Sequence, residues 1–155
     1  MRLTRREFAI AGMTTLAAAG LGQVPVRPAA LDPERVKAFV GAGHFDLAKV
    51  KEMLAAEPGL LNASWDWGGG DFESALEGAG HMGNREIALF LIGEGARMSI
   101  FQAAMLGELQ FVKAVIQLHP EAAKSKGPHG ITLLRHAEKG GELAKPVREY
   151  LLQLS

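Results

Sequence analysis

Apolar residues recur at helical spacing through most of this chain, in short stripes separated by small residues. Positions i, i+1, i+4 and i+5 share one face of a helix, so such stripes predict amphipathic helices packed on a common core. Two stripes have the same internal spacing: Ile87, Ala88, Leu91 and Ile92, then Phe111, Val112, Val115 and Ile116. We therefore expect a domain built from pairs of short helices.

The positions that close the first helix of each pair set the length of the repeat. These closing positions are Phe45, Gly83, Gly107 and Gly141. They are separated by 38, 24 and 34 residues. The middle interval is too short for a full unit, so the second and third units should be joined without a projecting hairpin. Capping residues predict helix starts at Asp32-Pro33-Glu34, at Asp46 and at Asn84.

The segment Gly70–Gly83 resembles the ankyrin repeat pattern Gly-x-Thr-Pro-Leu-His-x-Ala-Ala-x-x-Gly. Ser74 takes the Thr place, Leu76 the Leu place, and Ala79-Gly80 the paired small residues. An ankyrin repeat has about 33 residues. The resemblance implies an all-α fold, an ankyrin-like helical repeat solenoid of about four helix-pair units. These units are roughly 31–64, 65–97, 98–127 and 128–155, with an unrelated α-helical bundle as the alternative.

The first residues are expected to form a targeting signal rather than a fold element. Thr4-Arg5-Arg6-Glu7-Phe8 resembles the motif of twin-arginine (Tat) signal peptides, in which Arg5, Arg6 and Phe8 are the signal residues. A short apolar stretch follows, diluted by Gly, Thr and Ala. The resemblance implies a signal peptide over 1–30, a domain over 31–155, and a periplasmic or secreted location. The alternatives are an amphipathic N-terminal helix or mis-assigned start, and a protein that stays cytoplasmic or tethered by an uncleaved signal.

Composition and charge exclude several classes of function. Apolar residues make up 48% of the chain, which predicts a packed domain. Beyond residue 30 there are 13 Lys and Arg and 16 Asp and Glu residues, a net charge of −3, so no nucleic-acid partner is expected. With no cysteine, disulfides and thiolate-bound metals are excluded.

The segment Trp65–Glu73 is the most unusual in composition, with both tryptophans, three carboxylates and three consecutive glycines. In an ankyrin-like array it falls on the hairpin beside the concave groove, where exposed aromatic residues serve as binding anchors. The alternative is that the indoles fold back onto the first helix pair. The predicted partner-binding residues are Trp65, Asp66, Trp67, Asp71, Glu73, His81, Met105 and His129.

Sequence motifs for chemistry are weak. Gly78–Gly83 matches Gly-x-Gly-x-x-Gly but follows no strand pattern, so no nucleotide cofactor is predicted. The five histidines show no metal-ligand spacing, so no metal is predicted either. We expect a monomeric, non-catalytic protein–protein interaction module. The alternatives are a small Tat-exported hydrolase or metal-dependent enzyme using Asp66, Asp71, Glu73 and histidines, and a chaperone-like accessory without a single partner.

Overall fold

A computed structural model describes residues 28–154 of the chain. The predicted signal residues Arg5, Arg6 and Phe8 lie outside this range. From Leu31 onward the chain forms one structural unit. Within residues 28–154, no helix has the length and apolar character needed to cross a membrane.

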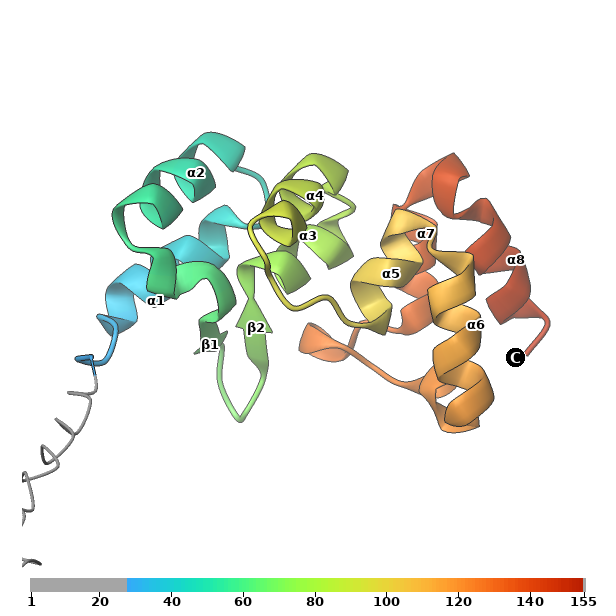
Figure 1. The fold of residues 1–155 in the computed structure, drawn as a ribbon. Coiled ribbons are helices and arrows are strands. Elements are labelled where there is room, and N and C mark those ends of the chain that lie inside the picture. Colours follow the sequence, from blue (N-terminus) through green and yellow to red (C-terminus); the bar gives the residue numbers. More distant parts are fainter. Residues whose placement is uncertain (1–27, 155) are drawn as a thin grey trace, which may run out of the picture. The chain divides into compact units, whose positions relative to one another are not determined.

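Eight α-helices in four consecutive pairs make up most of the described chain (Figure 1). The pairs are α1 (Pro33–Ala42) with α2 (Leu47–Ala56), α3 (Ala75–Met82) with α4 (Arg85–Gly93), α5 (Ile100–Leu106) with α6 (Leu109–Leu118), and α7 (Leu133–Lys139) with α8 (Lys145–Leu152). Short 3-10 turns add η2 (Pro58–Asn62), η3 (Pro120–Lys124), η4 (Pro128–Gly130) and η5 (Gly141–Ala144). The mostly helical fold expected from the sequence is confirmed.

Side-chain caps explain where the helices start and stop. The Asp32 carboxylate accepts hydrogen bonds from the backbone N–H groups of Glu34 and Arg35, and Asp46 and Asn84 cap α2 and α4 in the same way. These three predicted starts are confirmed. Gly83 and Gly107 end α3 and α5 in the left-handed conformation, with φ of 78° and 82°, which glycine adopts without steric cost.

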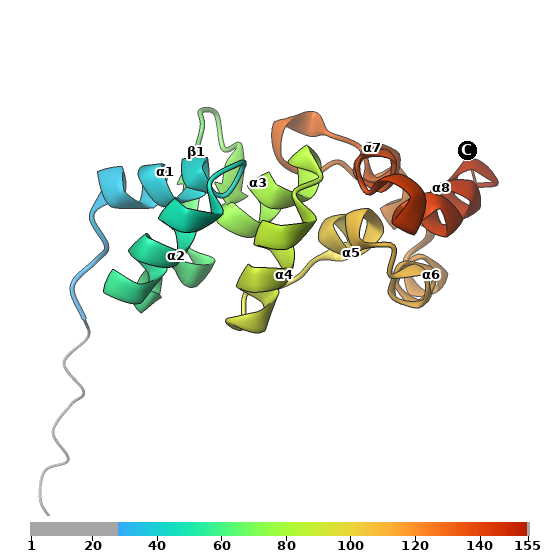
Figure 2. The same cartoon turned by 90° about the horizontal axis from the view of Figure 1, so that it is seen from above.

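The helices form two rows with the core between them (Figures 1 and 2). The first helices α1, α3, α5 and α7 pack on one another, and the second helices cover them on one side. The predicted stripes supply the core, since Ile87, Ala88 and Leu91 are buried, as are Val112 and Ile116. Phe45 departs from the expected pattern: it is 76% exposed, because the chain turns outward between α1 and α2.

Two loops project beside the first helices. The first is a hairpin of β1 (Ser64–Asp66) and β2 (Phe72–Ser74), paired antiparallel with Trp65 opposite Glu73. The second is the loop through η4, closed by a bridge between Lys126 and Thr132. The described segment between α4 and α5 contains no strand. Helix α3 contacts α7 as well as α5, and the two loops lie on the same side of the first helices (Figure 2).

His136 of α7 gives the fold a measurable pH dependence. Its side chain is fully buried, and burial lowers its pKa despite a hydrogen bond with the Thr132 carbonyl. The unfolded chain therefore takes up the proton first, and the free energy of unfolding falls as the pH drops below the ordinary histidine range near ~6.5.

We expect His136→Phe to lose less stability than wild type between pH 7 and pH 5, measured by urea unfolding at each pH. The same substitution at the exposed His119 should keep the wild-type pH dependence. Equal pH dependence in wild type and His136→Phe would show that His136 does not contribute.

Candidate metal centre

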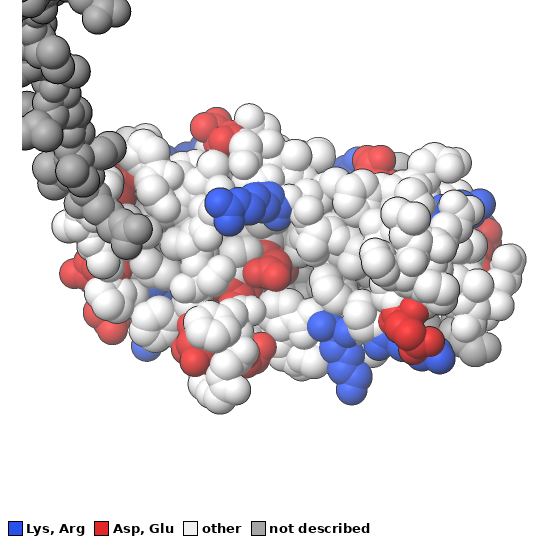
Figure 3. Space-filling model, turned by 60° about the horizontal axis from the view of Figure 1, so that its bottom comes forward, with Lys and Arg blue, Asp and Glu red and all other residues white. Residues whose placement is uncertain are grey.

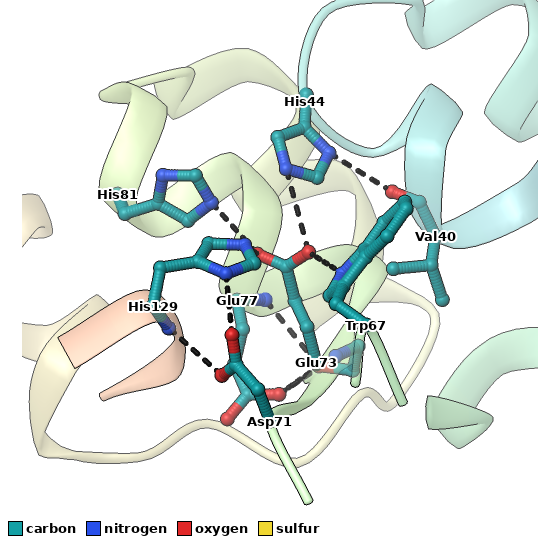
Figure 4. A network of polar contacts seen from close by, with 9 residues as sticks. Val40, His44, Trp67, Asp71, Glu73, Glu77, His81 and His129 are labelled. Atoms are coloured by element: carbon teal, nitrogen blue, oxygen red, sulfur yellow. Dashed lines mark hydrogen bonds and ion pairs between the residues drawn. The ribbon is translucent and has the colours of Figure 1, made fainter. Parts of the chain in front are cut away.

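Four side chains from four separate segments converge beside the first hairpin (Figure 4). His44 follows α1, Glu73 lies on β2, His81 lies in α3 and His129 lies in η4. One ligand atom from each of them lies within 4.8 Å of every other. The group thus joins the first two helix pairs and the loop before α7.

Glu73 is at the centre of this cluster and is fully buried. Its Oε1 atom lies 2.7 Å from His81 Nε2 and 3.5 Å from His129 Nε2. Its Oε2 atom accepts a 2.7 Å hydrogen bond from the Trp67 indole N–H and lies 3.4 Å from His44 Nε2. Burial by itself raises the pKa of Glu73, but the His81 hydrogen bond, the attraction of His44 and the Trp67 hydrogen bond together hold that pKa below its ordinary value.

Contacts on the outer side orient two of the imidazoles. His44 Nδ1 lies 3.1 Å from the Val40 carbonyl, to which its N–H donates, and His129 Nδ1 lies 2.7 Å from Asp71 Oδ2. The Asp71 pKa is lowered, first by the hydrogen bond from the His129 backbone N–H and also by the His129 side chain. With the Nδ1 protons directed outward, both Nε2 atoms face Glu73. Metal-binding histidines are typically held by such second hydrogen bonds.

Local backbone features make this convergence possible. His129 has a φ of 58°, which is uncommon for a residue with a side chain, and such conformations cluster at functional sites. On α3, a Cβ atom at Gly78 would lie 2.8 Å from the His44 ring, so a larger residue there would require this imidazole to shift. The Asp66 carboxylate shapes the hairpin tip by accepting hydrogen bonds from Gly68 and Gly70 N–H.

Three imidazole nitrogens and one carboxylate form a ligand set for a first-row transition metal. Metal–nitrogen bonds of about 2.0–2.1 Å place the ligands of a tetrahedral ion roughly 3.3 Å apart. His44 Nε2 lies 3.4 Å from Glu73 Oε2 and His129 Nε2 lies 3.5 Å from Glu73 Oε1, both near this value, whereas His81 Nε2 lies 2.7 Å from Oε1. Coordination of one ion through a single Glu73 oxygen therefore requires the side chains to rotate.

Five of the eight predicted contact residues meet here: Trp67, Asp71, Glu73, His81 and His129. Trp65 lies apart, with the Lys37 ammonium 5.5 Å from its ring centroid, and Asp66 only shapes the turn. Met105 is 1% exposed, so it is a core residue and does not fit the predicted contact role.

His44 was not selected from the sequence, because it is 29 residues from its nearest partner and belongs to no motif. Comparison with protein-family models, with curated proteins and with solved structures found no match to the chain. The interpretation of the cluster therefore depends on its geometry.

Proposed function

We propose that this protein binds a divalent first-row transition-metal ion through His44, Glu73, His81 and His129. The observation that carries the proposal is the direction of the imidazoles. Their Nε2 atoms converge on a buried carboxylate, while the Nδ1 atoms of His44 and His129 are held from outside by Val40 and Asp71. A proton on Nδ1 leaves a lone pair on Nε2 of a neutral imidazole.

Electrostatics favours positive charge between these groups, supplied by a proton or by a metal ion. The Nε2 atoms of His44 and His129 lie 3.4 and 3.5 Å from the buried Glu73 carboxylate. An imidazole lone pair that faces a carboxylate is repelled unless a proton or a metal cation lies between them. A divalent ion is a partner for all four groups at once, whereas the hydrogen bond between His81 and Glu73 engages only one pair.

Each residue has a separate role in the proposed site. The three Nε2 atoms and one Glu73 oxygen are the ligands. The second Glu73 oxygen stays with the Trp67 indole N–H, and Asp71 fixes the His129 ring. When bound, the ion supplies Lewis acidity and links the two loops.

Metal titration of the full-length protein tests the proposal. We expect Zn²⁺ to bind with one-to-one stoichiometry by isothermal titration calorimetry after chelator treatment. His129→Asn should weaken binding at least about 100-fold, because even outer contacts of a metal site are worth ~10–100-fold. Asparagine is chosen because it tolerates the positive φ at this position. His119→Asn, which changes an exposed histidine far along the chain, should bind as wild type does. Failure of the wild type to bind Zn²⁺, Fe²⁺ or Mn²⁺ would exclude the proposal.

A protein-binding role is a second candidate, supported by aromatic side chains on the surface near the hairpin. Phe45 is 76% exposed, Phe72 59% and Trp67 41%. In this second proposal the fold is an ankyrin-like solenoid, because paired helices with projecting loops are typical of ankyrin repeats, and the aromatic surface is its binding face. Export through the Tat pathway is part of the same proposal and depends on Thr4-Arg5-Arg6-Glu7-Phe8. Recovery of the protein in the periplasmic fraction, and its loss from there with Arg5→Lys and Arg6→Lys, would support export.

A further inference from the structure

We infer that the ion keeps one coordination position open toward a surface pocket, and that this position binds a small carboxylate with an apolar body. The inference rests on the metal site proposed above and names the class of ligand that the site accepts. Three observations support it: where the pocket lies, what lines it, and the charge that a divalent ion leaves at its floor.

The pocket lies directly over the imidazoles. Its lining residues are Gly41, His44, Phe45, Trp67 and His129, and its volume is about 340 Å³. Two of these residues, His44 and His129, are proposed metal ligands, whereas Glu73 and His81 lie deeper and are nearly inaccessible. A molecule in the pocket therefore meets the ion from the side of His44 and His129. Ligand pockets of proteins begin at about 300 Å³, which suits a small molecule.

Aromatic groups form the walls of this pocket. The Trp67 ring is perpendicular to the His44 ring, at 85° with centroids 6.5 Å apart, and lies 6.3 Å from the His129 ring. Phe45 presents its phenyl ring from the turn after α1, and Gly41 contributes no side chain. Figure 3 shows acidic and basic residues scattered among residues of other kinds on one face of the molecule. The aromatic rings of Trp67 and Phe45 in the lining suit an apolar body.

The charge of the metal site determines which polar group the ligand carries. A divalent ion held by three neutral imidazoles and one carboxylate leaves a net charge of about +1 at the floor of the pocket. Trp67 holds the second Glu73 oxygen by a hydrogen bond, which disfavours bidentate coordination by Glu73. Four-coordinate zinc can expand to five ligands, and first-row ions that prefer octahedral geometry have room for a further donor. An anionic oxygen donor of the ligand completes the coordination and neutralises the charge.

The probe for this inference is 3-phenylpropionate, which joins a carboxylate to a phenyl ring through two methylene groups. We expect it to bind full-length protein loaded with Co²⁺, to change the visible absorption of the ion, and not to bind the metal-free protein. The neutral analogue 3-phenylpropanamide should leave the spectrum unchanged. Phe45→Ala should weaken binding of the probe about tenfold and leave Co²⁺ affinity within about twofold. Phe111→Ala, which removes another exposed phenyl ring, is the matched control.

The two proposals fail in different ways. Absence of Co²⁺ and Zn²⁺ binding overturns the metal site and this inference together. Metal binding without a spectral change on adding 3-phenylpropionate overturns the ligand site alone. Equal binding of the probe with and without metal, or full affinity in Phe45→Ala, likewise overturns the ligand site.

Discussion

Glutamine in place of Glu73 is expected to weaken Zn²⁺ binding about 1,000-fold. The substitution keeps the shape of the side chain and an oxygen that can accept the Trp67 hydrogen bond, but it removes the only negative charge among the four ligands. Breaking a buried ion pair by removing one partner costs about 3–5 kcal/mol. The affinity is measured by competition with a chelator of known strength, because direct titration does not resolve tight binding.

The same variant should also change how metal-free protein responds to acid. The Glu73 pKa is lowered in the folded state, so the carboxylate contributes stability above its unfolded-state pKa near ~4.3 and loses it as the pH falls through the folded value. Glu73→Gln removes this contribution, and its stability should vary less with pH below ~4.3. Glu149→Gln, at an exposed carboxylate on α8, is the control. Unchanged metal affinity in Glu73→Gln would mean that Glu73 is not a ligand.

Most of the helices could be predicted, because the sequence features that specify them involve residues close together in the chain. The apolar stripe around Ile87 and Leu91 identified a buried helix face, and Asp32 and Asn84 marked helix starts through hydrogen bonds that span two or three residues. Both features depend on neighbours within one turn, which a sequence displays directly. The hairpin was expected from its place in an ankyrin-like array, and its three consecutive glycines have positive φ values of 131°, 68° and 88°.

The metal centre could not be predicted, because it is a property of packing between units. Asp71 and His129 are hydrogen-bonded partners separated by 58 residues. His44 and Glu73 come from different helix pairs, and no spacing rule connects them. Sequence reasoning identified Glu73, His81 and His129 as contact residues, and it grouped Glu73 with unspecified histidines only in the alternative of a hydrolase or metal-dependent enzyme.

One sequence feature does relate to the contact between the two loops. The 24-residue interval between Gly83 and Gly107 predicted a connection without a hairpin, and the segment between α4 and α5 has no strand. The loop through η4 contacts the first hairpin directly, where the His129 backbone N–H donates to Asp71 over 2.8 Å. The short connection between α4 and α5 therefore accompanies direct contact between the two loops.

Alanine in place of Gly78 is expected to weaken Zn²⁺ binding about 10–100-fold, although Gly78 touches no metal. Its Cβ atom would lie 2.8 Å from both Cε1 and Nδ1 of His44, so the ring has to move away from the Val40 carbonyl and from Glu73. Alanine is otherwise favourable inside a helix by about 0.5–1 kcal/mol, so α3 should remain folded. Gly93→Ala, with no atom within 4 Å of the added Cβ, is the matched control.

A double-mutant cycle distinguishes this mechanism from a general disturbance of α3. If Gly78→Ala acts by displacing the His44 ring, it has no further effect on Zn²⁺ affinity once His44 is replaced by alanine. Equal affinity losses on the wild-type and the His44→Ala background would instead place the effect in α3 itself. The coupling also reports on assembly of the site, because Gly78 lies in α3 and His44 follows α1. A strong coupling would mean that the close packing of these two helices sets the position of a metal ligand.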